Sequence, residues 1–255
     1  MKKITRFILI DLMRNRFVLA YSIFLMGTST LLFLVEDNPA KALIGLMNLI
    51  LFILPLVCLV FTTIYMYNSS EFIELLLSQP VKRKTLLLRI YLGLVFSFIG
   101  SAIFGIGLPI LIFHPTLGGL TLLSTSVLLS SAFCAIALLC AVYTRDKARG
   151  IGAALLLWFF FAFVFDGLVL FALYQFADYP LEKPMIIAAM LNPIDLSRIM
   201  LLLQTDLSAM LGFTGAIFQK FFGSIGGISL TFFTLLLWIV FPVLFAIRRF
   251  IKKDL

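Results

Sequence analysis

Long apolar stretches separated by short polar segments form the pattern of this chain of 255 residues. Each stretch has about the 20 residues that an α-helix needs to cross a lipid bilayer. The pattern therefore predicts an all-α, polytopic membrane protein whose residues 17–255 form one six-span domain. The predicted spans are Phe17–Val35, a helix within Ala42–Ser70, Ile90–Phe113, Thr121–Tyr143, Gly150–Phe176 and about Gly226–Ile247.

Two further segments alternate apolar and charged residues at helical spacing. Residues 1–16 predict an amphipathic helix lying in the membrane interface, with a frayed basic leader as the alternative. Residues 71–79 predict a short amphipathic helix between spans two and three, with carboxylates at Glu71 and Glu74, one turn apart. Pro80 stops this helix. A solvated loop is the alternative for this second segment.

The segment 178–224, between spans five and six, is too long for a passive connection and predicts a helical insertion. Asn192 can cap a helix that has Pro193 at its first position, and Thr205 can cap a second helix. Several apolar side chains between these caps are expected to be exposed and to offer a docking surface. Re-entry of the segment into the bilayer remains open.

Positive charge orients the predicted spans. Of the 20 Lys and Arg residues, 16 fall on one side of a six-span topology. Short loops rich in Lys and Arg stay in the cytoplasm, so both termini are expected there, and the 178–224 insertion is expected to be periplasmic. The four basic residues on the other side are Lys41, Lys183, Arg198 and Lys220.

Composition agrees with a membrane location. Hydrophobic residues make up 62% of the chain and charged residues 13%, and the mean hydropathy is +1.15. The net charge of +8 is explained by the cytoplasmic segments, so we expect anionic membrane lipid and not nucleic acid as its partner. Multi-pass insertion in a bacterial inner membrane is the predicted location.

Motifs for catalysis and for metal binding are absent from the sequence. His114 is the one histidine, and a Gly-Lys dipeptide, which a Walker A phosphate loop requires, does not occur. The spacing of the four Met residues within 178–224 does not place sulfur ligands on one helix face. We expect a non-enzymatic chain without a metal site or a cofactor of its own.

Asp166 is the acidic residue inside span five. It lies 16 residues after Gly150, or roughly 24 Å along a helix from the cytoplasmic end. An ionised carboxylate near the bilayer centre costs about 2.5–3.5 kcal/mol on insertion scales. Asp166 is therefore expected to line a path or gate, and a structural hydrogen bond near the outer interface is the alternative.

The sequence E-L-L-L-S-Q-P-V-K-R over residues 74–83, placed between spans two and three, resembles ABC-2 type transporter permeases. In that family this segment is the coupling helix that docks on a cytoplasmic ATPase. The chain departs from the family just upstream, where it reads Y-N-S-S-E-F over 67–72 in place of an E-x-E-x-G-T block. The resemblance implies coupling residues at Glu71, Glu74, Leu75, Leu76, Pro80 and Arg83.

Short motifs around Asp166, 191–198 and 211–218 are similar to those of permeases that serve the maturation of nitrous oxide reductase. This likeness implies a permease dimer, an ATPase dimer that holds ATP and Mg, and a periplasmic accessory protein for copper–sulfur cluster assembly. We expect the accessory protein to dock at Asn192, Pro193, Asp195, Arg198 and Leu202. An ABC-2 exporter of drugs, lipids or ions and a non-transport membrane scaffold are the alternative functions.

Overall fold

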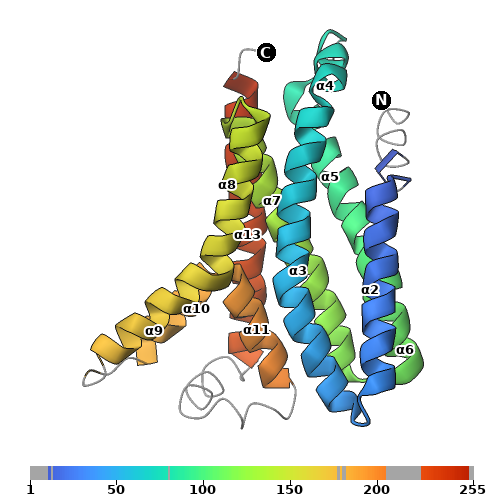
Figure 1. The fold of residues 1–255 in the computed structure, drawn as a ribbon. Coiled ribbons are helices and arrows are strands. Elements are labelled where there is room, and N and C mark those ends of the chain that lie inside the picture. Colours follow the sequence, from blue (N-terminus) through green and yellow to red (C-terminus); the bar gives the residue numbers. More distant parts are fainter. Residues whose placement is uncertain are drawn as a thin grey trace.

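A computed structural model describes residues 11–12, 14–79, 81–176, 179, 182–204 and 225–252. Those residues form helices and no strands (Figure 1). Six helical segments are long and apolar enough to cross a membrane, which confirms the predicted number of spans. These segments are Arg16–Val35, Pro39–Asn68, Arg83–Phe113, Leu117–Tyr143, Lys147–Gln175 and Gly227–Lys252.

The helices follow one another along the chain, and the connections that the structure describes in full are short. In chain order they are α2 (Arg16–Val35), α3 (Pro39–Asn68), α4 (Ser70–Leu77), α5 (Arg83–Ala102), the π-helical η1 (Ile103–Gly107), α6 (Leu108–Phe113), α7 (Leu117–Tyr143), α8 (Lys147–Phe159), the π-helical η2 (Phe160–Val164), α9 (Phe165–Gln175), α10 (Glu182–Leu191), α11 (Pro193–Gln204) and α13 (Ile225–Lys252). The predicted interfacial helix 1–16 lies almost wholly outside the described residues.

The third span begins earlier than the sequence pattern indicated. Its helix starts at Arg83, whereas the apolar run alone suggested Ile90. Lys84 and Arg89 lie within its first two turns. Lys and Arg are good helix formers, so the helix extends beyond its apolar part. The second span, predicted to lie within 42–70, also begins earlier: its helix is Pro39–Asn68, and Asn38 caps its start by accepting a hydrogen bond from the Ala40 amide.

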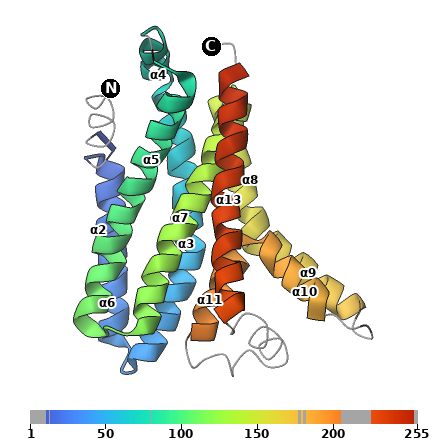
Figure 2. The same cartoon turned by 180° about the vertical axis from the view of Figure 1, so that it is seen from behind.

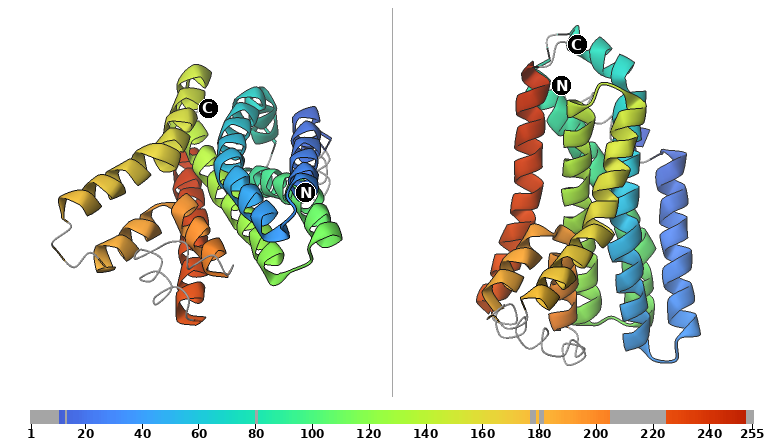
Figure 3. Two further views of the ribbon diagram at one scale, coloured as in Figure 1. Left: turned by 60° about the horizontal axis from the view of Figure 1, so that its bottom comes forward. Right: turned by 60° about the vertical axis from the view of Figure 1, so that its left-hand side comes forward.

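The helix α7 lies at the centre of the bundle, between α3, α5, α11 and α13 (Figures 2 and 3). Its inward positions carry mostly small side chains, which allow close helix approach. The buried hydroxyls of Ser126, Ser130 and Ser131 donate to backbone carbonyls of the preceding turn, so they enter the apolar core with their hydrogen bonds satisfied.

A π-helical turn brings α2 and the third span into close contact. Pro109 has no amide hydrogen, so the carbonyl of Gly105, four residues earlier, lacks its α-helical donor. The buried Ser29 hydroxyl of α2 donates to that carbonyl, at 2.5 Å. A Cβ atom added at Gly105 would lie 2.5 Å from Leu25 Cβ, so the contact requires glycine. Proline, glycine and serine together explain the tight crossing.

The start of α2, the end of α13 and the helix α4 lie at one end of the bundle (Figures 1 and 2). Arg83 donates through Nη1 to the Ile251 carbonyl at 3.2 Å, and the Arg249 guanidinium lies 5.4 Å from the centre of the Tyr143 ring. These contacts tie α5 and α7 to α13 at this end. The carbonyls at a helix C-terminus favour such a positive partner.

The fifth span leaves the bundle along its length. The first part, α8, packs on α3 and α7, whereas α9 contains no buried residue and leans away from the other spans (Figure 1). The helices α10 and α11 meet at a bend of 113°. Trp238 of α13 donates through Nε1 to the Met190 carbonyl of α10, at 3.1 Å. The bent pair is thereby held against the sixth span.

Candidate functional site

The amphipathic segment predicted over 71–79 forms the helix α4, at Ser70–Leu77. It projects beyond the ends of the spans (Figure 1). Ile73 and Leu76 turn inward and are buried in the main apolar core. The opposite side carries the exposed residues Glu71, Phe72, Glu74 and Leu75. Leu75 is 67% exposed, so α4 presents an apolar and acidic surface outside the bundle while its other face anchors it.

Some residues expected to contact an ATPase through α4 are placed elsewhere. Leu76 is 7% exposed and serves the anchoring face, because it lies three residues after the inward-facing Ile73. Arg83 reaches the end of α13 through the Ile251 carbonyl. Pro80 lies outside the described residues. Glu71, Glu74 and Leu75 thus remain on the surface where the sequence predicted a partner.

A joint between α3 and α8 lies directly before α4. The Tyr67 hydroxyl forms hydrogen bonds with the hydroxyl and the carbonyl of Thr144, at the end of α7. The Tyr67 ring rests on Gly150, where any Cβ atom would overlap it. Lys147 Nζ donates to Asn68 Oδ1 at 2.8 Å. The end of α3, which α4 follows directly, is thereby tied to the start of the fifth span.

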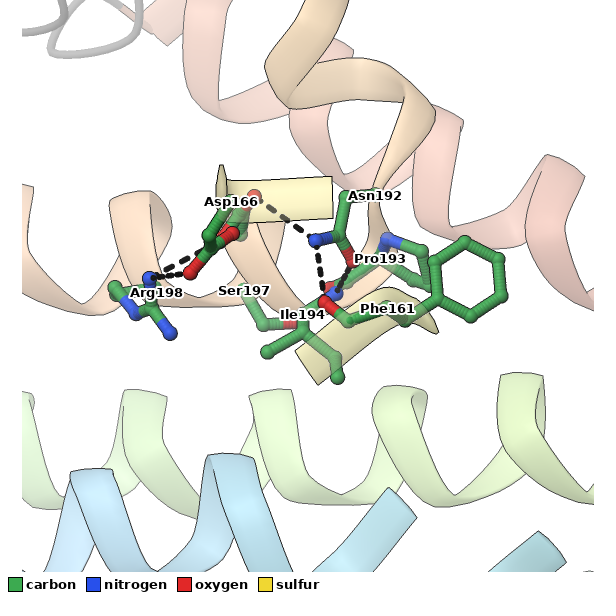
Figure 4. A network of polar contacts seen from close by, with 8 residues as sticks. Phe161, Asp166, Asn192, Pro193, Ile194, Ser197 and Arg198 are labelled. Carbon is green, nitrogen blue, oxygen red and sulfur yellow. Dashed lines mark hydrogen bonds and ion pairs between the residues drawn. The ribbon is translucent and has the colours of Figure 1, made fainter. Parts of the chain in front are cut away.

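A polar cluster around Asn192 lies where η2 and α9, in the second half of the fifth span, meet α11 (Figure 4). Asn192 Oδ1 accepts from the Ile194 amide at 3.0 Å, which confirms the predicted cap of the helix that begins at Pro193. Its Nδ2 donates to the Phe161 carbonyl and to Asp195 Oδ2, each at 2.9 Å. Every polar atom of this fully buried amide has a partner, so it can lie inside the protein without an unmet hydrogen bond.

The π-helical turn η2 creates the acceptor for Asn192. The Phe165 amide bonds to the Phe160 carbonyl, one residue before its α-helical partner. The Phe161 carbonyl is thus left without its usual donor, and Asn192 supplies one. Single π-helical turns within α-helices often mark functional positions. The turn also directs α9, which begins at Phe165, away from the bundle.

Arg198 completes the cluster by joining α11 to α9. Its Nη1 donates to Asp166 Oδ2 at 3.2 Å and to Asp195 Oδ1 at 3.1 Å. The Arg198 and Asp166 side chains are 38% and 32% exposed, and that of Asp195 is 17% exposed. Asp195 lies outside the six spans. Burial, followed by the hydrogen bond and charge of Asp166, raises its pKa to about 7, while Arg198 and Asn192 oppose the shift.

The expected exposure of the outer apolar residues was wrong. Ile194, Leu196, Ile199 and Leu201 are all buried, because α11 packs on α7, α13 and α3 with these side chains inward. Asn192 and Pro193 are also buried, so they stabilise the bend and do not form a surface for direct docking. Asp195, Arg198 and Leu202 are partly exposed. Thr205 and the rest of the insertion up to residue 224 lie outside the described residues.

The sequence named Asp166, Asp195 and Arg198 separately but did not pair them. The sequence nevertheless contained a signal, because an intramembrane carboxylate requires a polar or cationic partner. Between Asp166 and Thr205 the basic candidates are Lys183 and Arg198, and only Arg198 lies in a predicted outer helix. Asp195 and Arg198 are also helical neighbours at i and i+3. Phe161 and the joint at Tyr67 and Gly150 had no such signal, since both arise from local backbone geometry and close packing.

No family model matches this chain, and no curated protein matches it significantly. Within the described residues, no group of three or more His, Cys, Asp or Glu side chains is placed to hold a metal ion. The cysteines Cys58 and Cys134 are buried as free thiols, and Cys140 is partly buried. The features of the described residues that bear on function are therefore α4, the joint at its base and the polar cluster.

Proposed function

We propose that this chain is the membrane subunit of an ABC-2 type transporter, which couples ATP hydrolysis by a separate ATPase to work across a bacterial inner membrane. The observation that carries the proposal is α4, a short helix anchored by Ile73 and Leu76 that exposes Glu74 and Leu75 beyond the bundle. A helix held by one face offers the other face to a partner as a rigid body.

The orientation in this proposal places α4, both termini and the basic loops in the cytoplasm. Support comes from the positions of Arg16, Arg83, Lys147 and Arg249, which all lie near the helix ends on the α4 side of the bundle. The bent α10–α11 pair then belongs to the periplasmic side. Among the described residues, this orientation agrees with retention of Lys-rich and Arg-rich loops in the cytoplasm.

The work performed is transport or mechanical signalling. In the signalling form, an ATPase dimer moves α4 in each of two permease copies, and the outer helices pass the movement to a periplasmic accessory protein. Copper–sulfur cluster assembly for nitrous oxide reductase is the pathway that the sequence likeness favours. Export of drugs, lipids or ions is the second candidate, and the partly exposed charges of Asp166 and Arg198 beside a groove favour it.

Thiol labelling tests the orientation. Ser78→Cys at the end of α4 should resist an impermeant maleimide in intact cells and react after permeabilisation. Leu117→Cys, at a position 82% exposed at the other end of the bundle, should react in intact cells. The native thiols of Cys58 and Cys134 are buried, and the partly buried Cys140 is replaced by serine in both variants so that it gives no background. Labelling of Ser78→Cys in intact cells would overturn the orientation.

Affinity purification tests the partner. The tagged chain, co-expressed with an ABC-type ATPase from the same genome, should retain that ATPase in an equimolar complex that hydrolyses ATP. The tagged chain expressed alone should show no ATP hydrolysis above background. Recovery of a folded permease without any ATPase under both low and high salt would contradict the proposal and would favour the membrane-scaffold alternative.

A further inference from the structure

The helices α9, α10 and α11 enclose a groove that no step of the proposed coupling uses. One part, with a volume of about 300 Å³, is lined by all three helices, and an adjoining part, of about 510 Å³, lies between α9 and α10. The two parts share the walls Phe165, Val169, Leu173 and Met185. Volumes of this size are typical of sites for organic molecules. The groove is open on one side and almost entirely apolar.

Charge is confined to one end of the groove. Its charged wall residues, among those that the structure describes, are Asp166, Asp195 and Arg198. Arg198 contacts both carboxylates through the single atom Nη1. When both carboxylates are ionised, which for Asp195 requires a pH above its raised pKa of about 7, the three charged side chains that the structure describes here carry one net negative charge. Asp166 engages Arg198 through Oδ2 alone and its side chain is 32% exposed, so part of its carboxylate remains accessible to a ligand.

The apolar surroundings make this negative charge discriminate strongly between cationic and anionic ligands. Asp166 belongs to the fifth span, where apolar walls reduce the screening of charge that water would provide. An anionic head group would meet uncompensated repulsion at this end, whereas a cation would neutralise the groove. The adjoining part adds the aromatic side chains of Phe165, Phe176 and Tyr179, whose ring faces attract cations.

We propose that this groove binds an amphiphilic organic cation, with its positive charge beside Asp166 and its apolar part between α9 and α10. Charge complementarity selects this occupant over an anionic lipid. The shape also fits, because the part with the three charged residues is the smaller one, at about 300 Å³, whereas the larger part, at about 510 Å³, is lined by apolar side chains. The inference does not depend on the ATPase, and failure of either proposal would leave the other in place.

A matched pair of probes separates charge from apolar partitioning. Tetraphenylphosphonium and tetraphenylborate have the same shape and opposite charge. The whole chain of 255 residues is placed in nanodiscs of phosphatidylcholine at pH 8, above the pKa of Asp195, and binding is measured by equilibrium dialysis against empty nanodiscs. We expect saturable binding of tetraphenylphosphonium at one site per chain and no saturable binding of tetraphenylborate. Equal binding of the two ions would show partitioning into lipid and would overturn the proposal.

Two charge variants separate an effect of charge from a structural role of the cluster. Asp166→Asn removes the excess negative charge and should weaken tetraphenylphosphonium binding at least roughly tenfold. Arg198→Gln removes the cation that lowers the pKa of Asp195, so Asp195 takes up a proton and the pair of carboxyl groups keeps about one negative charge; tetraphenylphosphonium binding should therefore not weaken. Arg149→Gln, at a side chain 85% exposed outside the groove, should leave it unchanged. A structural role for the cluster would weaken binding in both groove variants alike, which contradicts the inference.

A groove-filling variant tests the apolar part separately. Ala188 lines the larger part of the groove, so Ala188→Trp should abolish tetraphenylphosphonium binding while the three charges stay in place. The thermal unfolding midpoint shows whether the variant remains folded. If Ala188→Trp changes the oligomeric state, and the wild type binds no tetraphenylphosphonium, the groove is a contact between copies of this chain and the inference fails.

Discussion

Glu74→Lys combined with Leu75→Asp should abolish binding of the partner ATPase while the six-span bundle stays folded. Both side chains are exposed on the outer face of α4, and Leu75 is 67% exposed, so neither change disturbs the core. A central contact of an interface is commonly worth about 2 kcal/mol or more, which is roughly thirtyfold in affinity. The measurement is the amount of ATPase retained per permease during affinity purification, together with the thermal unfolding midpoint of the permease.

Two control variants make the result specific to this face. Leu117→Asp makes the same substitution as Leu75→Asp at an exposed position at the other end of the bundle and should retain the ATPase fully. Leu76→Asp places a charge on the buried anchoring face and should lower the unfolding midpoint, because an unpaired buried charge is strongly destabilising. If the Glu74 and Leu75 double variant retained as much ATPase as Leu117→Asp, α4 would not be the coupling helix.

The number of spans and the position of α4 could be predicted because they depend on local sequence. An apolar run of about 20 residues has few other stable placements, and the spacing of Ile73 and Leu76 between acidic residues fixes an amphipathic helix. The cap at Asn192 followed from the adjacent Pro193 for the same reason. Helix starts such as Arg83 were missed because charged residues continue a helix beyond the apolar run.

The candidate sites depend on contacts between distant residues and were only partly predictable. Asp166 was recognised as costly inside a span, but its partner lies 32 residues later, on a different helix. The burial of Ile194 and Leu196 was missed because an apolar face looks the same in sequence whether it meets a bundle or a solvent-exposed partner. The π-helical turn at Phe160–Val164 has no sequence signature in this chain, since its five residues are ordinary helix-compatible side chains.

These contacts define a continuous route between the two ends of the protein. The helix α4 follows α3 directly. Tyr67 and Asn68 of α3 contact Thr144 at the end of α7 and Lys147 and Gly150 at the start of the fifth span. That span continues through η2 to α9, where Asp166 holds Arg198 of α11. Rigid helices joined by such contacts can carry a displacement over their length. The tightest packing along this route is at Gly150, against the Tyr67 ring. We therefore expect a substitution at Gly150 to reduce how much of a displacement of α4 reaches the outer helices.

Gly150→Ala should therefore weaken transmission to the outer helices and lower the stability of the bundle. The added methyl group overlaps the Tyr67 ring, so either the ring leaves Thr144 or α8 moves away from α3. Overpacking of this kind costs about 1–3 kcal/mol. Stability is measured by thermal unfolding. Transmission is measured as the ATP-dependent change in the labelling rate of Ile187→Cys, at a position 60% exposed on α10, in complexes with the ATPase.

Gly152 provides a matched control two residues along the same helix, because a Cβ atom there would meet nothing within 4 Å. Gly152→Ala should be neutral or stabilise the helix by up to about 1 kcal/mol, and ATP should still change the labelling of Ile187→Cys. Adding Tyr67→Leu to Gly150→Ala removes the ring and should restore the unfolding midpoint, whereas Tyr67→Phe keeps the overlap and should not. Because only the Gly150 methyl group meets the ring, identical behaviour of the two alanine variants in both measurements would show that α3 and the fifth span move independently.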